Sequence, residues 1–237
     1  MASKLSVIAG NLQRVRGRIA AAARRSGRAP DEVELLPVTK TEGADEIRIL
    51  LELGMHRVGE SRVLDAAKKA AAFASDDLEW HLIGHLQRNK VVRALDLFSF
   101  LHSLDSVRLA KALARELVDR GRTLACLIEV NTSGAPQKHG FQPDELPAAA
   151  DAIALLPGLR VEGLMTMAML ADDPEKARPC FALLRELAQQ LRLRNVPQVR
   201  MKHLSMGMTQ DFEVAVEEGA TIVRVGTALF EGADDAG

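Results

Sequence analysis

A lysine at the end of an apolar run is the first residue in this sequence that could do chemistry. Lys40 ends the run 34–40, and Gly43 then introduces a helical pattern, which predicts a strand that enters a loop and a helix. The α/β barrels hold their reactive groups at such strand ends. Desolvation there would favour the neutral amine, a nucleophile toward carbonyl carbon. In the alternative, Lys40 only extends from the rim into water.

Two segments late in the chain pair a hydroxyl with glycine. Residues 204–209 contain Ser205 before a helix expected near Thr209, and residues 224–227 contain Gly226 and Thr227. The loops after strands seven and eight of α/β barrels commonly bind phosphate through backbone N–H groups and a helix N-terminus. In the alternative, Ser205 and Thr227 cap helices and the glycines form turns. The occurrence of both segments together favours a phosphate site.

Arg224 interrupts an otherwise apolar strand two residues before Gly226. A buried guanidinium stays charged and needs a partner. That partner would be a carboxylate such as Glu129, or a cofactor ring nitrogen that the arginine keeps unprotonated. A reactive lysine, a phosphate site and an inward arginine together suggest a phosphorylated aldehyde bound as a Schiff base, and pyridoxal 5′-phosphate fits this description.

Alternating strands and helices predict the scaffold that positions these residues. The expected strands are 34–40, 56–60, 79–84, 97–103, 123–131, 160–167, 199–205 and 220–226. The expected helices between them are 43–54, 61–74, 86–95, 105–120, 143–156, 174–193 and 209–218. Near-continuous apolar strands that alternate with helices indicate a parallel sheet covered on both faces. Eight such units favour the α/β class with a single closed (β/α)8, or TIM, barrel.

One domain, 1–237, is expected, with the barrel over about 34–231 and an extra amphipathic helix over about 3–25. The formal net charge of −1 favours neither nucleic acid nor a membrane surface as a partner. Cys126 and Cys180 have no metal-ligand spacing, the N-terminal residues show no apolar h-region, and no apolar run of about 18 residues occurs. These features predict a cytoplasmic protein. The basic face of the first helix is expected to be solvated.

Two histidines could suggest a metal pair, because His81 and His85 flank Gly84. His81 lies in an expected strand, so the pair does not share one face of a helix, and no carboxylate or cysteine completes a ligand set. We therefore expect no metal site. His85 is expected to begin a helix with exposed basic residues.

Five segments resemble the pyridoxal phosphate homeostasis protein family (YggS/PROSC type). They are Val-Thr-Lys-Thr at 38–41, Gly-Glu-Ser-Arg at 59–62, Trp-His-Leu-Ile-Gly-His-Leu-Gln-Arg-Asn-Lys at 80–90, Leu-Ser-Met-Gly-Met at 204–208 and Val-Arg-Val-Gly-Thr at 223–227. The resemblance implies a single barrel like the N-terminal domain of alanine racemase, with pyridoxal 5′-phosphate as cofactor and no metal.

The resemblance also implies roles for particular residues. Lys40 would hold the cofactor as an internal aldimine, and Arg224 would face the pyridine nitrogen. The remaining contacts would be Met165 near the ring and Ser205, Gly226 and Thr227 at the phosphate. Ser61 stands where the family usually has Asn, so its contact with the ring would lose reach. Lys138, in the loop after strand five, would be a second aldehyde contact or a solvent-facing lysine.

Two functions follow from this reading. The first is a non-catalytic carrier that binds the cofactor reversibly in vitamin B6 homeostasis, buffers the free aldehyde and delivers it to apoenzymes. The second is a racemase-like enzyme. Alanine racemases use a lysine and a tyrosine as their two bases, whereas this sequence has no tyrosine. We therefore expect a carrier without catalytic residues, and a monomer. A Schiff-base barrel acting on sugar phosphates is a third reading, which the motifs disfavour.

Overall fold

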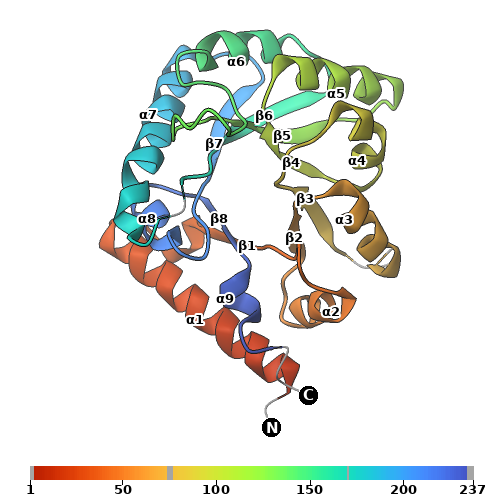
Figure 1. Ribbon diagram of the computed structural model, residues 1–237. Coiled ribbons are helices and arrows are strands. Elements are labelled where there is room, and N and C mark those ends of the chain that lie inside the picture. The colour runs from red at the N-terminus through yellow and green to blue at the C-terminus, as the bar shows by residue number, and fades with distance from the viewer. Residues whose placement is uncertain (1–2, 74–76, 170, 234–237) are drawn as a thin grey trace.

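The computed structural model describes residues 3–73, 77–169 and 171–233. Its strands form one parallel sheet, ringed by helices (Figure 1). The strands are β1 (Glu34–Pro37), β2 (Arg57–Glu60), β3 (Glu79–Leu82), β4 (Phe100–Leu104), β5 (Leu124–Glu129), β6 (Leu159–Met165), β7 (Val199–Ser205) and β8 (Ile222–Val225). The (β/α)8 barrel expected from the sequence is confirmed.

The ring closes between β1 and β2. Within the sheet the strand order is β1-β8-β7-β6-β5-β4-β3-β2, with every pair parallel. Past the end of β1, Val38 forms a parallel bridge with Gly59, and Thr39 N donates to Gly59 O at 3.0 Å. The sheet therefore has no long unpaired edge, and the segment before Lys40 is held at the seam.

The helices cover the outside of the ring (Figure 1). They are α1 (Lys4–Arg25), α2 (Ala44–Glu52), α3 (Val63–Ala70), α4 (Val91–Leu97), α5 (Val107–Asp119), α6 (Leu146–Ala154), α7 (Arg178–Arg194), α8 (Phe212–Glu217) and α9 (Thr227–Phe230). Short 3₁₀ turns are η1 (Pro30–Glu32), η2 (Ala71–Phe73), η3 (Arg88–Lys90) and η4 (Pro174–Ala177). No helix among the described residues is long and apolar enough to cross a membrane.

Several expected boundaries were wrong. The helix expected at 143–156 begins only at Leu146, because Glu145 reaches back to Gln142 N in a turn and Pro147 supplies the residue without an N–H for the first turn. The helices expected at 86–95 and 174–193 each begin with a 3₁₀ turn, and the helix expected from residue 209 begins at Phe212. Residue 74, at the end of the helix expected at 61–74, lies outside the described residues. The helix α9 was not among the expected helices, although Thr227 was considered as a helix cap.

The helix α1 packs against α8 and α9 (Figure 1). Its arginines are exposed, as expected from the sequence. Asn11, buried on α1, donates through Nδ2 to Leu229 O and Glu231 O, at 3.0 and 2.9 Å. These two bonds satisfy carbonyls at the end of α9. The helix α1 thereby holds the segment that follows the last strand.

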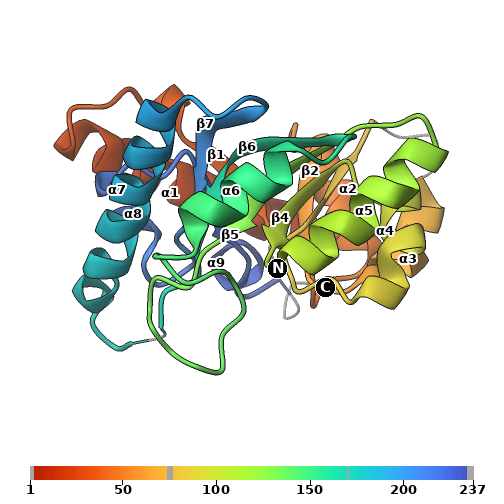
Figure 2. The same ribbon diagram turned by 90° about the horizontal axis from the view of Figure 1, so that it is seen from above.

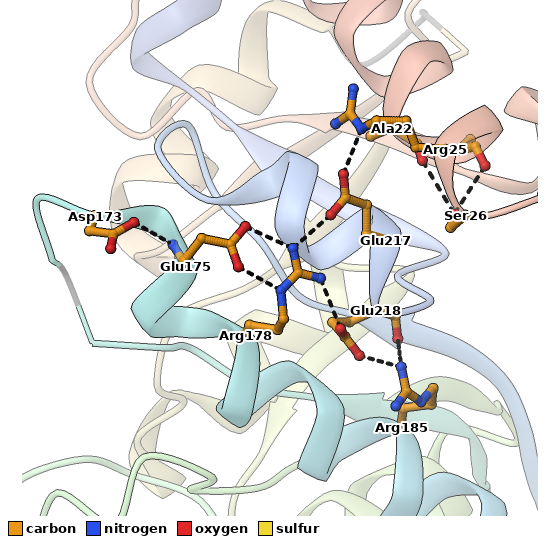
Figure 3. Close-up of polar contacts among 10 residues, drawn as sticks. Ala22, Arg25, Ser26, Asp173, Glu175, Arg178, Arg185, Glu217 and Glu218 are labelled. Atoms are coloured by element: carbon orange, nitrogen blue, oxygen red, sulfur yellow. Dashed lines mark hydrogen bonds and ion pairs between the residues drawn. The ribbon is translucent and has the colours of Figure 1, made fainter.

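An ion-pair cluster joins α1, α7 and α8 (Figure 3). Arg178 contacts Glu175, Glu217 and Glu218, at 2.6, 2.7 and 2.9 Å. Glu217 also accepts from Arg25 on α1 at 2.7 Å. The side chain of Arg178 is about one-third exposed, so these pairs contribute modestly to stability and mainly fix the packing of the three helices.

Candidate functional site

The predicted site residues gather at the carboxyl ends of the strands. Met165, at the end of β6, lies beside Ser205, at the end of β7, in the sheet register. A Cβ built on Gly226 would lie 3.1 Å from Val38 O, so the end of β8 closely approaches the segment that leads to Lys40. The long loop from β5 to α6 projects beyond the strand ends on one side of the barrel (Figure 2).

Lys40 stands two residues beyond the bridge at Val38, in a turn, and its side chain is exposed. The expectation that strand 34–40 would desolvate it was wrong, because β1 ends at Pro37 and the chain turns outward. Lys40 Nζ has no hydrogen-bond partner in the described part of the chain. It lines a cavity of about 330 Å³ together with Thr41, Glu60, Ser61, Arg62 and Asp65.

A buried ion pair supports the turn at Lys40. Glu60 is fully buried, and its Oε1 accepts from Thr39 Oγ1 at 2.7 Å and from Lys69 Nζ at 2.8 Å. Lys69 Nζ also donates to Thr39 O at 2.6 Å. Thr39 is therefore fixed through both its side chain and its carbonyl. Lys69 was not predicted from the sequence. Nothing in the sequence around it indicates a buried ion pair, except that it follows Glu60 by nine residues.

Ser61 is half-buried and lines the same cavity as Lys40. Its backbone packs directly on Gly84, where an added Cβ would lie 2.3 Å from Ser61 O. Ser103 Oγ donates to Gly84 O at 2.6 Å from the far side. Gly84 is thus required for the close approach of the β2 and β3 ends, and it sets the position of Ser61.

Arg224 points into the barrel and is almost fully buried. Its Nη1 donates to Ser205 Oγ at 2.6 Å, and its Nη2 donates to Thr166 O at 2.9 Å. The carboxylate of Glu129, one of the partners considered from the sequence, forms no ion pair with it. Burial lowers the pKa of Arg224 to about 10, so the guanidinium is charged at neutral pH.

A chain of hydrogen bonds continues from Arg224 through the barrel. His102 Nδ1 lies 2.9 Å from Ser205 Oγ, and His102 Nε2 lies 3.0 Å from His81 Nδ1. Burial lowers the pKa of His81 to about 4 and that of His102 well below its usual value, so both rings are neutral at pH 7. Because Arg224 can only donate, Ser205 donates onward to His102, which donates to His81.

His102 was missed from the sequence. The sequence gives little indication of a functional role for it, because a single histidine within the apolar run of β4 is typical of an ordinary core residue. The contact that gives it a role, to Ser205, spans 103 residues of sequence. His81 and His85 are not a pair, because His81 points into this chain of bonds while His85 lies at the rim.

Ser205 and Met165, both expected at the cofactor, are fully buried. The hydroxyl of Ser205 is bonded to Arg224 and His102, so its side chain supports the arginine. Gly226 is half-buried, and Thr227 is exposed as the first residue of α9. Of the expected phosphate contacts, only these two are open to solvent.

A carboxyl group and a second lysine lie at the same end of the barrel. Burial, followed by the charge of Asp105, raises the pKa of Glu129 to about 7. Lys138 is half-buried in the loop after β5, and its Nζ donates to Met167 O at 2.8 Å. Desolvation lowers the pKa of Lys138. The amine of Lys138 is therefore tied to the segment that follows β6, and the residue is partly exposed, so its role stays a prediction.

Residues 10–234 match the family model described as alanine racemase, N-terminal domain. The pyridoxal phosphate homeostasis protein of Aquifex aeolicus is 42% identical over 219 residues, covering 92% of this chain and 95% of that protein. The protein of the same name from Pseudomonas aeruginosa is 40% identical over 233 residues, covering 98% of each. The structure of PipY from Synechococcus elongatus PCC7942 with PLP bound is 36% identical, with a TM-score of 0.83 over 94% of this chain and 99% of that one.

Proposed function

The chain belongs to the pyridoxal phosphate homeostasis protein family, and from this we propose that it binds pyridoxal 5′-phosphate in the cytoplasm and maintains the supply of that cofactor. Related proteins carry this function in their names, and the PipY structure holds PLP on the same fold. The observation that carries the proposal is a free lysine amine at Lys40 and a permanent buried cation at Arg224, both at the carboxyl end of the barrel.

The residues present fit the cofactor. Lys40 Nζ is exposed at a cavity and would hold the aldehyde carbon covalently, and Arg224 would orient the pyridine nitrogen and keep it unprotonated. We assign the phosphate to Gly226 and Thr227, which are accessible next to the end of β1. Ser205 instead holds Arg224. When bound, the cofactor supplies an electrophilic carbon and an electron-withdrawing ring.

The surroundings of the ring favour binding over turnover. An arginine at the ring nitrogen prevents the ring from becoming a strong electron sink, which limits carbanion chemistry. The sequence has no tyrosine, so the second base of a tyrosine-dependent racemase is missing. We therefore propose a non-catalytic monomeric carrier that buffers the cofactor and delivers it to apoenzymes.

Borohydride trapping tests the anchor. Wild-type protein with the cofactor should show visible absorbance that reduction abolishes, with the pyridoxyl group on the peptide containing Lys40. The variant Lys40→Ala should trap nothing, whereas Lys68→Ala, at an exposed lysine on α3, should trap as wild type. Trapping at full level in Lys40→Ala would disprove this anchor and direct attention to Lys138.

Two assays test the carrier role. Loaded protein should reactivate an apoenzyme that depends on this cofactor faster than an equal amount of free cofactor in the presence of a scavenging phosphatase. Chiral chromatography should find no conversion of L-alanine to D-alanine, and sedimentation should give a 25.7 kDa monomer. Racemisation that is lost in Lys40→Ala would instead establish the racemase alternative.

A further inference from the structure

Three side chains with metal-binding atoms meet at the rim of the barrel, on the β3–β5 side. His85 follows β3, Asp105 follows β4, and His139 lies in the loop after β5. Their ligand atoms all lie within 4.8 Å of one another. None of the three has a role in the cofactor site proposed above.

The carboxylate is the centre of this group. Asp105 Oδ2 lies 2.6 Å from His85 Nδ1 and 3.9 Å from His139 Nδ1. The side chain of Asp105 is only 8% exposed, and neither lysine nor arginine forms an ion pair with it in the described part of the chain. A nearly buried carboxylate without a permanent cation needs a positive partner. Among the described residues, only the two imidazoles form a hydrogen bond or ion pair with its side chain.

The imidazoles stack on each other over this carboxylate. The ring centroids of His85 and His139 lie 4.0 Å apart, and the ring planes differ by 8°. Each imidazole carries ring nitrogens that can serve as metal ligands. Two imidazole nitrogens and a carboxylate oxygen are ligands that Zn²⁺ and its neighbours in the first transition series prefer.

The loop that carries His139 is held in place near the other two residues. Val130 pairs with Phe141 in a parallel bridge, and Asn131 Nδ2 donates to Ala135 O at 2.8 Å. Lys138 donates to Met167 O next to His139. His139 is therefore fixed from both sides, which reduces the entropy lost when a ligand set forms.

We propose that His85, Asp105 and His139 bind a divalent transition-metal ion, of which Zn²⁺ is the best match, with water completing the coordination. Zinc ligands about 2.1 Å from the metal lie about 3.4 Å from one another in a tetrahedral site. The present contacts of 2.6 and 3.9 Å bracket that separation. Rotation of the exposed His139 side chain, with a small opening of the His85 contact, would form the site.

Calorimetric titration of untagged protein, free of cofactor, with Zn²⁺ tests the proposal, with Co²⁺ absorbance as a second readout. One equivalent should bind, and His139→Ala and His85→Ala should each weaken binding at least tenfold. His56→Ala, at an exposed histidine that follows α2, should leave the affinity unchanged within twofold. The Co²⁺ spectrum should show nitrogen and oxygen ligands without a thiolate band from Cys180.

His139→Ala carries the test, because this exposed loop residue can be removed without loss of the fold. Equal affinity in wild type and His139→Ala would overturn the proposal and leave a hydrogen-bonded histidine stack. A thiolate band, or equal loss in His56→Ala, would also overturn it. Because no cofactor is present, these results do not depend on whether Lys40 binds pyridoxal phosphate.

Discussion

The substitution Ser205→Ala should destabilise the protein far more than the loss of one serine hydroxyl ordinarily does. This hydroxyl accepts a hydrogen bond from the charged Arg224 at 2.6 Å and lies 2.9 Å from His102 Nδ1. All three side chains are buried, and Ser205 is fully so. Alanine would leave one guanidinium N–H and one imidazole nitrogen without partners inside the barrel.

The magnitude follows from these two orphaned groups. A hydrogen bond to a charged group contributes about 1.5–3 kcal/mol, and a buried polar group left unsatisfied costs about 1–3 kcal/mol. We therefore expect a loss of about 3 kcal/mol or more in the free energy of unfolding. In a domain of this size that lowers the melting temperature by roughly 6–12 °C.

Urea unfolding of the cofactor-free protein measures the effect. Ser103→Ala is the matched control, since its buried hydroxyl makes a single hydrogen bond to Gly84 O and should cost about 1 kcal/mol. Adding His102→Leu to Ser205→Ala should recover little of the loss, because it removes one orphaned nitrogen but leaves His81 Nδ1 without its donor. If Ser205→Ala cost no more than Ser103→Ala, the directed chain from Arg224 to His102 would be refuted.

Three further predictions concern buried charges and one close contact. Because the pKa of Glu129 is raised to about 7, the folded wild type loses stability relative to the unfolded chain as pH rises from about 4.5 to 7. The stability of Glu129→Gln relative to wild type should therefore increase by about 3 kcal/mol between pH 4.5 and 8, measured by urea unfolding; a constant difference would contradict the buried titration. Lys69→Met leaves Glu60 as an unpaired buried carboxylate and should cost about 3–5 kcal/mol, most of it recovered on adding Glu60→Gln. Gly84→Ala should lower both the melting temperature, by roughly 2–12 °C, and the cofactor affinity, because its Cβ would meet Ser61 O at 2.3 Å; unchanged affinity would show that Ser61 has no part in the site.

The barrel could be predicted from the sequence because its signal is local and repeated. Each apolar strand and each amphipathic helix reports its own type, and eight repeats leave few alternatives. The boundaries were less certain, because 3₁₀ turns and caps depend on single contacts such as that of Glu145 with Gln142 N. The helix α9 has only four residues, too few for a periodic pattern.

For the site, the sequence indicates only which polar residues lie near the ends of the strands. Lys40, Arg224, Gly226 and Thr227 were chosen for their places at or just after expected strand ends and for the resemblance to a known family, and their roles stay predictions. The partners of Arg224 could not be found this way, because the contact between His102 and Ser205 joins residues 103 apart in the sequence. Such pairs form only when the ring closes.

The barrel stabilises a buried cation without neutralising it, and this bears on what the site can do. An arginine paired with Glu129 would present little net charge to a ligand. Here the guanidinium donates to a hydroxyl and a backbone carbonyl, both of them uncharged. Beyond the hydroxyl, the hydrogen bonds continue through the neutral imidazoles of His102 and His81. The positive charge of Arg224 is therefore not cancelled by an ion pair with a carboxylate, which is what the proposed contact with a cofactor ring nitrogen requires.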